Sequence, residues 1–495
     1  MKPDRVVWIF GSSRTGSTWL SDMMGDSGGQ VVWREPLIGA LFGQFYYQRA
    51  PHRAEREGGA GEHFIMGGKH AKTWLGPMRD MVLTGGAARF PEAAGGAYLV
   101  IKEPNGSMGA PLLLRALPES RLVLLVRDPR DVVASSMDAR LEGSWRAESR
   151  QNFVRKGGTL DPGDLDRFVK TRARLYAETV TRAKQAYDAH EGRKALVRYE
   201  ELRADTLGTM RRMYSELAIA VDDGQLARAV DRHSWECIPD DQKGAGKFYR
   251  RATPGGWRED LTPEQAKIVE KITTRLLEEL YPEESTGGAP SAAATPTAPR
   301  ASKISAPSAP AGARKRASAA PLAMPFQVRR SRRSRIRRAT RRLPRRLLRA
   351  SRPPGEAQTP QRMDPANLVW IFGTGRTGST WVTDMMAEVD GHSVWFEPRV
   401  GELFAVDRAR GHHHILHPKY RRTWLGSIRG FVLDGAEARF PALGSRDHLV
   451  VKDPGGSPGA PLVMQALPES RMVLLVRDPR DVVASWLDAS RSEGW

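Results

Sequence analysis

The chain has 495 residues, of which 40% are hydrophobic, so it is long enough for two or three domains that each bury a core. Its single cysteine, Cys237, excludes an intrachain disulfide, and no apolar run is long enough for a signal segment or a bilayer span, which predicts a cytoplasmic protein. The formal net charge is +20, but 15 positive charges lie between Arg314 and Arg349 without an acid. The remainder is only mildly basic, so no specific nucleic-acid partner is expected.

A strand, a turn bounded by glycines and a helix are predicted at the start of the chain. Residues 6–10 form a continuous apolar run, which is typical of a strand covered on both faces. Gly11 and Gly16 bound the turn, and the helix that follows would aim its first N–H groups at an anion. The spacing is nearly that of a Walker loop, but Ser17 replaces the lysine and the cation, Arg14, lies within the loop. This disfavours an ATPase and favours another doubly anionic ligand, with a strand–turn–helix of no binding function as the alternative.

Strands and helices then alternate along the first 282 residues. Further strands are predicted at 31–36, 98–104, 121–127 and 195–199. Helices are predicted at 74–83, 164–190, 206–217, 225–231 and 263–280, the last capped by Thr262, and a polar loop at 47–68. This alternation predicts an α/β, P-loop-type three-layer fold with a mostly parallel central sheet flanked by helices. Ligands of such sheets bind at the carboxyl ends of the strands, where the charged motifs lie.

A second strand–turn–helix junction carries Arg127 and, eight residues later, Ser135. The guanidinium offers a fork of donors suited to phosphate, and Ser135 lies on the first turns of the helix, where it can donate to the same anion. A local salt-bridged turn explains residues 127–130 equally well when they are seen alone. With the first loop, however, two separated anion sites favour a ligand with two separated anionic groups.

Residues 284–365 differ in composition from the rest of the chain. They are rich first in Ala, Pro, Ser and Thr and then in Arg, which predicts a disordered linker. Residues 328–348 have the pattern of a basic amphipathic helix for an anionic surface, although a solvated tether is the simpler interpretation. The Ala-, Arg- and Gly-rich usage of the whole chain suggests a bacterial source.

The opening loop recurs at residues 370–381. We therefore expect a complete domain at 1–283 and a second, C-terminally truncated copy at 366–495, in which nothing corresponds to residues 146–282.

The two junctions together resemble the nucleotide motifs of PAPS-dependent sulfotransferases, where PAPS is 3′-phosphoadenosine 5′-phosphosulfate. Residues 14–19 resemble the 5′-phosphosulfate loop of that family, and residues 127–135 resemble its 3′-phosphate motif. Residues 197–202 and 250–257 also resemble family segments, although Ala252 and Gly256 depart from the second pattern. The resemblance implies a PAPS site formed by residues of these motifs: Ser13, Arg14, Thr15, Gly16, Ser17, Thr18, Trp19, Arg127, Ser135, Arg250 and Arg251.

The same resemblance implies catalytic roles for three residues. Arg14 would stabilise charge on the leaving phosphate. Glu35 precedes a proline, as in carbohydrate sulfotransferases, and would be the base, with a mere ion pair to Arg14 as the alternative. Lys102 ends a strand and would contact the sulfuryl group secondarily. The implied reaction transfers the sulfuryl group of PAPS to a hydroxyl acceptor, a carbohydrate or glycolipid, without a metal. The rival interpretations are an inactive scaffold and a nucleotide kinase.

The second copy keeps equivalents of these residues but lacks the closing segment, so we expect weak PAPS binding there or none. The equivalents are Arg376, Thr377, Gly378, Ser379, Thr380, Glu397, Arg477 and Ser485. A cluster at His412, His413, His414 and His417 lacks the spacing of a zinc site. Trp33, Trp74 and Trp257 lie near the motifs and are candidates to stack on adenine or a sugar.

Overall fold

A computed structural model describes residues 1–49, 63–140, 144, 162–251, 253–282, 363–405 and 411–490. The described residues all belong to one compact unit, which spans Met1–Gly288 and Gln361–Trp495. The predicted linker lies almost entirely outside the described residues, as do its basic run and most of the predicted loop at 47–68. We call the described residues up to 282 the first half and those from 363 the second half.

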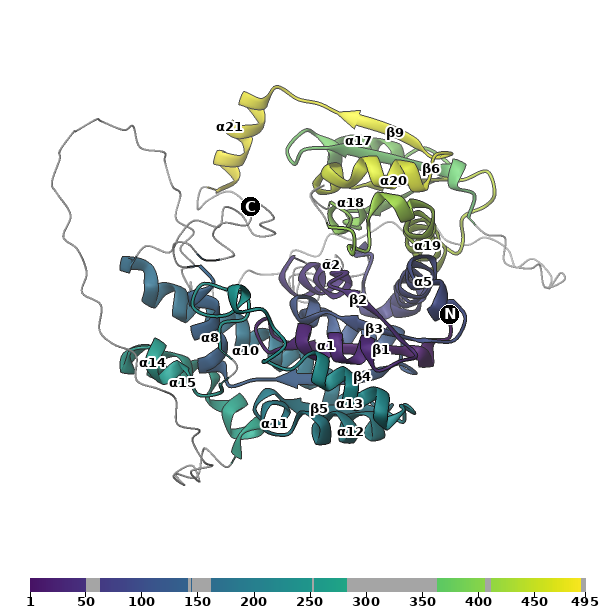
Figure 1. Ribbon diagram of the computed structural model, residues 1–495. Helices are drawn as coiled ribbons and strands as arrows, with labels where there is room; N and C mark the ends of the chain where they lie inside the picture. Colours follow the sequence, from purple (N-terminus) through teal and green to yellow (C-terminus); the bar gives the residue numbers. More distant parts are fainter. Residues whose placement is uncertain are drawn as a thin grey trace. The chain divides into compact units, whose positions relative to one another are not determined.

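Five parallel strands form the sheet of the first half (Figure 1). They are β1 (Val6–Gly11), β2 (Gln30–Arg34), β3 (Tyr98–Lys102), β4 (Arg121–Val126) and β5 (Lys194–Arg198). Their order is β2-β3-β1-β4-β5, and every neighbouring pair is parallel. The reversal of strand order beside β1 places the ends of β1 and β4 at the crevice where open α/β sheets bind ligands.

Helices cover both faces of this sheet, because successive side chains of the central strand point to opposite sides. Trp8 and Phe10 of β1 pack into one apolar cluster, and Val7 and Ile9 into another. The helices of the first cluster are α2 (Ile38–Gln44), α5 (Ala71–Arg89), α7 (Ala110–Ala116), α10 (Leu165–Ala189) and α15 (Pro263–Leu280). Those of the second are α1 (Ser17–Asp26), α11 (Tyr199–Ala204), α12 (Thr206–Glu216) and α13 (Asp223–Arg232). The prediction of a three-layer fold around a parallel sheet is confirmed.

Shorter elements complete the first half. The helix α8 (Pro129–Asp138) follows β4 and packs with α10 and α15 in a third apolar cluster. The others are α6 (Pro91–Ala94), α14 (Trp257–Asp260), the π-helical turn η2 (Phe45–Arg49), and the 3-10 turns η1 (Pro3–Arg5), η3 (Gly68–His70), η4 (Pro104–Gly109), η5 (Pro162–Asp164) and η6 (Asp240–Gln242).

Most predicted helices have nearly their predicted ends, but α5 is longer. The helix α15 matches its prediction, and Thr262 and Gln265 form a reciprocal capping box at its start. The helix predicted at 74–83 extends from Ala71 to Arg89 and includes Gly85 and Gly86. Because glycine often follows the last turn of a helix, the sequence predicts an end before these two residues. A Cβ atom on Gly86 would lie 2.6 Å from the Leu99 side chain, so glycine is required here for close packing on the sheet.

The second half forms a four-stranded parallel sheet of order β7-β8-β6-β9. Its strands are β6 (Leu368–Gly373), β7 (His392–Phe396), β8 (His448–Lys452) and β9 (Arg471–Leu475). Its helices are α17 (Ser379–Ala387), α18 (Val400–Leu403), α19 (Arg421–Arg439), α20 (Ala460–Ala466) and α21 (Pro479–Ser490), with 3-10 turns η7 (Pro365–Asn367), η8 (Pro418–Tyr420) and η9 (Pro454–Gly459). Element for element, this is the order of β2, β3, β1 and β4.

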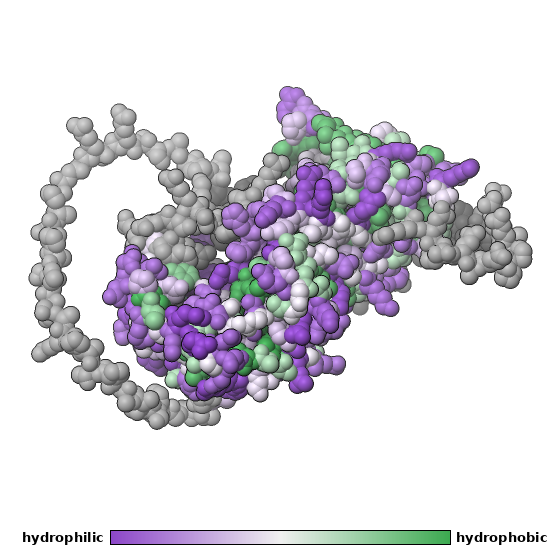
Figure 2. Space-filling model, turned by 45° about the vertical axis from the view of Figure 1, so that its right-hand side comes forward, coloured by the Kyte–Doolittle hydropathy of each residue, from purple (hydrophilic) through white to green (hydrophobic). Residues whose placement is uncertain are grey.

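The outer strand of this second sheet is exposed. Leu474 on β9 is 62% exposed, whereas Leu124 at the same place in β4 is 1% exposed beneath the neighbouring strand and helices. Val476 and Trp486 are also exposed, and hydrophobic residues are visible at the surface in Figure 2. Among the described residues, no strand pairs with the free edge of β9. Within the same part of the chain, no helix is long and apolar enough to cross a bilayer.

Candidate active site

The loop between β1 and α1 has the backbone of an anion-binding turn. Arg14 and Gly16 have φ angles of 69° and 85°, and Gly16 caps the N-terminus of α1. The Thr15 hydroxyl donates to the Ser12 carbonyl at 2.8 Å, which closes the turn from inside. Because a Cβ atom on Gly16 would lie 2.8 Å from the Tyr199 ring, only glycine allows the loop to approach this ring.

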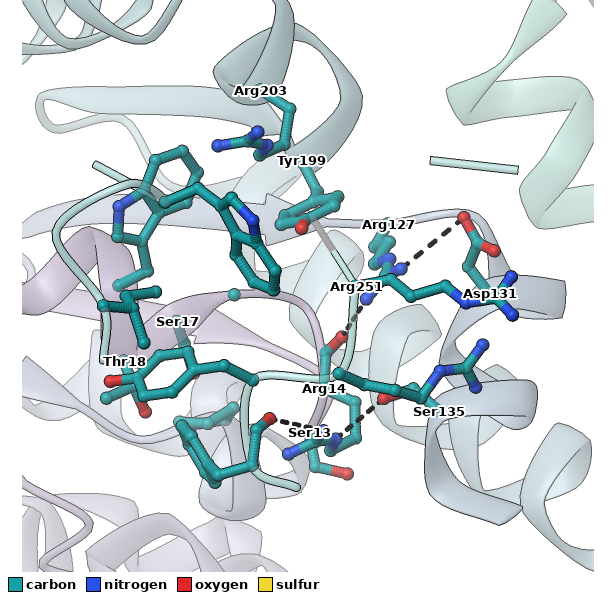
Figure 3. Close-up of a pocket in the computed structure, with 18 of the residues that line it drawn as sticks. Ser13, Arg14, Ser17, Thr18, Arg127, Asp131, Ser135, Tyr199, Arg203 and Arg251 are labelled. Carbon is teal, nitrogen blue, oxygen red and sulfur yellow. Dashed lines mark hydrogen bonds and ion pairs between the residues drawn. The ribbon is translucent and has the colours of Figure 1, made fainter. Parts of the chain in front are cut away.

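A pocket of about 390 Å³ opens over this loop (Figure 3). Nearly all the predicted site residues of the first half line it, although they come from segments far apart in the sequence. They are Ser13, Arg14, Gly16, Ser17, Thr18, Trp19, Glu35, Lys102, Arg127, Ser135, Arg250 and Arg251. Thr15 is the exception, since its side chain is fully buried and turned into the loop.

The two predicted anion sites are neighbours in this pocket. Arg14 Nε donates to Ser135 Oγ at 3.0 Å, and Arg127 Nη1 donates to the Arg14 carbonyl at 3.2 Å (Figure 3). The Arg127 guanidinium lies 4.3 Å from the centre of the Tyr199 ring and 3.6 Å from the Asp131 carboxylate. Among the described residues, no hydrogen-bond acceptor pairs with its buried Nε atom. This end of the pocket therefore holds donors that an anion can use.

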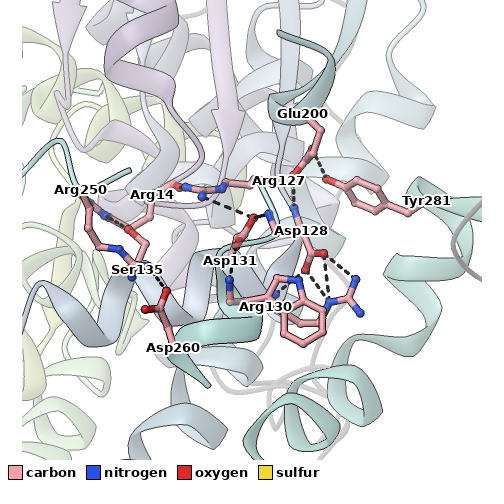
Figure 4. A network of polar contacts seen from close by, with 12 residues as sticks. Arg14, Arg127, Asp128, Arg130, Asp131, Ser135, Glu200, Arg250, Asp260 and Tyr281 are labelled. Atoms are coloured by element: carbon pink, nitrogen blue, oxygen red, sulfur yellow. Dashed lines mark hydrogen bonds and ion pairs between the residues drawn. The ribbon is translucent and has the colours of Figure 1, made fainter. Parts of the chain in front are cut away.

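Behind Arg127, the turn at Asp128 is a buried network of its own (Figure 4). Asp128 accepts from the Arg130 guanidinium at 2.7 Å, and its N–H donates to Glu200 at 3.0 Å. Tyr281 donates to the other Glu200 oxygen at 3.2 Å, and burial raises the pKa of Glu200. The salt-bridged turn is thus present at Asp128 and Arg130, while Arg127 alone faces the pocket.

The segment that ends in α14 is fixed to α8 through Asp131. This carboxylate accepts from the N–H groups of Gly255 and Trp257 at 2.8 and 3.0 Å. The segment carries Arg250, which pairs with Asp260 and whose pKa is lowered by burial. It also carries Arg251, which pairs with Glu259 at 2.7 Å. Both arginines are therefore brought to the pocket wall with their charges already balanced.

The predicted base, Glu35, pairs with Lys102 and not with Arg14. Its Oε1 lies 3.0 Å from Lys102 Nζ, and its Oε2 accepts from Asn105 Nδ2 at 2.7 Å. Lys102 Nζ also donates to Thr18 Oγ1 at 3.2 Å, so it links the base to the anion-binding loop. Glu35 has a φ angle of 53°, and its N–H donates to the Lys102 carbonyl at 2.8 Å, which fixes the turn after β2 against β3.

A second carboxyl group lies beneath this turn. Glu103 is fully buried, and its Oε1 accepts from the Gly39 N–H at 2.7 Å, at the start of α2. Burial raises the pKa of Glu103 well above its ordinary value, and the nearby charge of Glu35 acts in the same direction. Glu103 thus supports the turn that carries Glu35 and lies outside the pocket lining.

Several lining residues were not predicted as site residues. Tyr199 begins α11, and Asn105 follows the strand end at Lys102 by three residues, so both belong to motifs already visible in the sequence. Most of the others come from the segment 233–249, which carries no recognisable pattern: His233, Trp235, Ile238, Phe248 and Tyr249. The rest are Pro104, Asp131, Arg203, Thr253 and Gly256. Among the described residues, no cluster of His, Cys, Asp or Glu is suited to a metal ion.

The suggestion that three tryptophans stack on a ligand is wrong for two of them. Trp33 and Trp74 are fully buried in the apolar core. Trp257 packs under Arg130, whose guanidinium lies 4.3 Å from the centre of the Trp257 ring. Trp257 does not line the pocket. Trp33 and Trp74 are core residues because they lie on inward-facing positions of β2 and α5.

The second half repeats part of this arrangement. Arg376 Nε donates to Ser485 Oγ at 2.9 Å, and Arg477 Nη1 donates to the Arg376 carbonyl at 3.1 Å. Glu397 lies 2.5 Å from Lys452 Nζ. Thr377, Gly378, Ser379 and Thr380 form the corresponding loop and helix start, with a φ angle of 90° at Gly378. Arg477 and Ser485 are far more exposed than Arg127 and Ser135, because no described residues stand where Tyr199 and the segment 233–251 stand in the first half.

Residues 7–223 match the model of the family described as "Sulfotransferase family". No curated protein matches the sequence. Among solved structures, the chain is similar to mouse sulfotransferase SULT7A1 complexed with PAP, at 12% identity over 58% of this chain and 90% of that one, with a TM-score of 0.37. Sulfotransferase STF9 from Mycobacterium avium is 16% identical over 56% and 77% of the two chains, with a TM-score of 0.33. Retinol dehydratase in complex with androsterone and inactive cofactor PAP is 18% identical over 56% and 82%, with a TM-score of 0.28. The match to the sulfotransferase family thus lies within the first half of the chain, over residues 7–223.

Proposed function

We propose that the first half transfers the sulfuryl group of PAPS to a hydroxyl group of a carbohydrate or glycolipid, with Glu35 as the general base. The observation that carries the proposal is the convergence in one pocket of two anion sites, at Arg14 and at Arg127, with the Glu35–Lys102 pair. PAP, the product that remains after transfer, has two separated phosphate groups that match these two sites.

The residues present fit such a donor. The buried Arg127 Nε lacks an acceptor within the described residues, and Ser135 and Arg14 lie beside it. Gly16 brings the N-terminal N–H groups of α1 to the same pocket. We assign the 3′-phosphate to Arg127 and Ser135, with Arg250 and Arg251 on the covering segment. The 5′-phosphosulfate is assigned to the loop from Ser13 to Trp19.

Sulfuryl transfer requires positioning and charge stabilisation from the protein more than covalent participation. A Glu35 oxygen accepts the proton of the acceptor hydroxyl while the hydroxyl oxygen forms a bond to sulfur. The bond between sulfur and the bridging oxygen of the leaving phosphate breaks at the same time. Lys102 and Thr18 lie between Glu35 and the loop, so Lys102 is placed to stabilise the transferring group while Arg14 stabilises the leaving phosphate. No step requires an oxidant or a metal.

A polar acceptor is supported by what surrounds the base. Glu35, Lys102 and Asn105 line the pocket together, and their side chains bond to one another at 3.0 and 2.7 Å. An acceptor with several hydroxyl groups, such as a sugar, can exchange hydrogen bonds with this trio. We also propose that the second half is a repeat of the first, which is supported by the matching strand order and by the Arg376–Ser485 bond.

The test is sulfuryl transfer from labelled PAPS to a panel of mono- and oligosaccharides, using the full chain. The change Glu35→Gln is expected to lower kcat by about 10²–10⁴-fold, because a positioned base contributes about that much. Affinity for PAP should change less than about twofold, since the glutamine keeps the shape of the site. The matched change Glu397→Gln should leave kcat unchanged. Full activity in Glu35→Gln, or an equal loss in both variants, would contradict the assignment.

A further inference from the structure

The two halves exchange short loops within their common compact unit. Residues 411–417 of the second half lie against the turn that carries Glu35. The Trp33 indole N–H donates to the His413 carbonyl at 2.5 Å, and the Ile415 N–H donates to the Pro36 carbonyl at 2.9 Å. Trp33 and Pro36 flank Glu35 in the sequence. A segment of the second half therefore contacts the residues on both sides of Glu35, through the Trp33 side chain and the Pro36 backbone.

The exchange is reciprocal. Residues 63–66 of the first half lie against the turn that carries Glu397. The Trp395 indole N–H donates to the His63 carbonyl at 2.6 Å, and the Ile65 N–H donates to the Pro398 carbonyl at 3.1 Å. The same two hydrogen bonds are thus made in both directions, which is the pattern of an interface between symmetry-related subunits.

A partly buried arginine donates hydrogen bonds to each loop. Arg89 Nη2 donates to the carbonyls of His414 and Ile415, both at 2.9 Å, while Nη1 donates to Gly85 of its own helix. Its guanidinium lies 4.7 Å from the Trp33 ring centre and 3.9 Å from that of Tyr420. Burial lowers the pKa of Arg89 to about 10. Taking a guanidinium out of water is costly unless its N–H groups find acceptors, so the two loop carbonyls stabilise Arg89 in this position, where its Nε has no acceptor among the described residues.

Arg439 has the corresponding contacts in the second half. Its Nη2 donates to the carbonyls of Phe64 and Ile65 at 2.6 and 3.3 Å, and Nη1 donates to Gly435 of its own helix. Burial lowers its pKa to about 10 as well. The equivalence of Arg89 and Arg439 supplies a matched pair of positions for a test.

Each helix has a glycine where the isoleucine of the exchanged loop inserts. A Cβ atom on Gly85 would lie 3.1 Å from Ile415 Cδ1, and one on Gly435 would lie 2.9 Å from Ile65 Cδ1. Both isoleucines are buried, at 1% and 0% exposure. Glycine inside a helix is less favourable than alanine, so its presence at both places is explained by the room that the isoleucines need.

The contact extends along the apolar faces of the helices. The helices α5 and α19 pack together, and the rings of Phe42 and Phe431 stack with their centres 5.5 Å apart. His413 on this loop lies near positive charges of the first half. Burial lowers the pKa of His413, and the charges of Arg34 and Lys102 lower it further.

We propose that the second half acts as a built-in partner subunit, whose loop 411–417 positions Glu35 for transfer in the first half. Arg89 and Trp33 are the positioning residues that receive this loop. The proposal rests on the proposed function, since it concerns the same base. It assigns the second half a role in the chemistry that does not require the second half to bind PAPS.

The test compares Arg89→Met with Arg439→Met in the full chain. Arg89→Met is expected to lower kcat by at least about tenfold while KM for PAPS and affinity for PAP stay within about twofold, because misplacing a reacting group mainly slows the chemical step. Arg439→Met should lower kcat by less than about threefold. A kcat in Arg89→Met that is unchanged, or equal to that in Arg439→Met, would overturn the proposal.

Hydrogen–deuterium exchange separates this proposal from the proposed function. In Arg89→Met, exchange should accelerate in the peptides covering 33–39 and 411–417, and in Arg439→Met in those covering 63–66 and 395–401. If Arg89→Met does not fold, Trp33→Phe removes one loop hydrogen bond but keeps the ring, and Trp395→Phe is its control. Unchanged exchange in the Arg89 or Trp33 variant overturns the loop contact even in an active enzyme. An unmodified chain that neither binds PAP nor transfers sulfuryl groups would overturn the proposed function. In that case the hydrogen–deuterium exchange data would still show whether loop 411–417 contacts the turn that carries Glu35.

Discussion

Two buried carboxyl groups support the turns that carry Glu35 and Glu397. Glu103 accepts from the Gly39 N–H at 2.7 Å, and Asp453 accepts from the Gly401 N–H at 2.9 Å. In each group the other oxygen is buried without a partner in the described part of the chain. Burial raises the pKa of Asp453 to about 6 and that of Glu103 well above its ordinary value.

A raised carboxyl pKa makes stability depend on pH in a defined direction. The folded state then binds more protons than the unfolded state, so the free energy of unfolding falls as the pH rises from the unfolded pKa through the folded one. For Asp453 this window runs from 3.8 to about 6, a shift of about two units that corresponds to roughly 3 kcal/mol at most.

Asp453→Asn should remove this dependence, because asparagine is neutral throughout and its oxygen can still accept from Gly401. The midpoint of thermal unfolding of the variant, relative to the unmodified chain, is expected to increase between pH 4 and pH 6.5. For Glu103→Gln, the relative midpoint of thermal unfolding should also increase with pH, over a range that extends to higher pH. This variant should retain sulfuryl transfer. A pH profile parallel to that of the unmodified chain would contradict the assignment of the raised pKa values.

The residue types that carry charge could be predicted, but their pairing could not. Arg14, Glu35 and Lys102 follow strand ends, so the sequence indicates that they share one edge of the sheet. The sequence does not indicate which cation pairs with Glu35, because that depends on the directions of side chains on three separate strands. The structure gives Lys102 this place, at 3.0 Å.

At the scale of elements, the β1–α1 loop depends on Gly16 and on its neighbour α11. The φ angle of Gly16 is 85°, and a Cβ atom there would lie 2.8 Å from the Tyr199 ring. The equivalent Gly378 has a φ angle of 90°, but none of the described residues beyond its immediate chain neighbours lies within 4 Å of its Cβ position. Glycine is therefore required at position 16 both by the backbone angle and by the close approach of Tyr199. At position 378 only the backbone angle requires it.

Gly16→Ala should thus be more damaging than Gly378→Ala. The backbone strain common to both is about 1 kcal/mol, and the first variant must also displace Tyr199 from the Arg127 guanidinium. We expect Gly16→Ala to lower PAP affinity by at least about tenfold and Gly378→Ala to leave it unchanged, as measured by calorimetric titration. Equal effects of the two changes on affinity would contradict this account of the loop.

The elements were more predictable than their contacts. Apolar runs and turn residues locate the strands and the helix α15 because both signals are local. The loop exchange could not be predicted in this way, since Trp33 and His413 are separated by 380 residues and neither has a distinctive neighbour pattern. The histidine cluster shows this most clearly: the carbonyls of His413 and His414 accept from Trp33 and Arg89, while the rings of His414 and His417 accept from nearby backbone N–H groups.

At the scale of the whole molecule, the two halves have unequal sites. The first half encloses its anion sites with Tyr199 and the segment up to Arg251, whereas in the described part of the second half Arg477 is exposed and Ser485 is only partly buried. The exchanged loops join the two halves, and the pocket described here is lined by residues of the first half. The account therefore predicts one donor site per chain.

Calorimetric titration of the full chain with PAP, beside ATP with magnesium, tests this claim most directly. The expected result is one PAP bound per chain and weaker binding of ATP. Arg127→Ala should weaken PAP binding by at least about tenfold, because a charge-assisted hydrogen bond is worth about 1.5–3 kcal/mol, and Arg477→Ala should have no effect. A folded chain that does not bind PAP, or that prefers ATP with magnesium, would contradict the sulfotransferase site, and two equivalent PAP sites would contradict the division of roles between the halves.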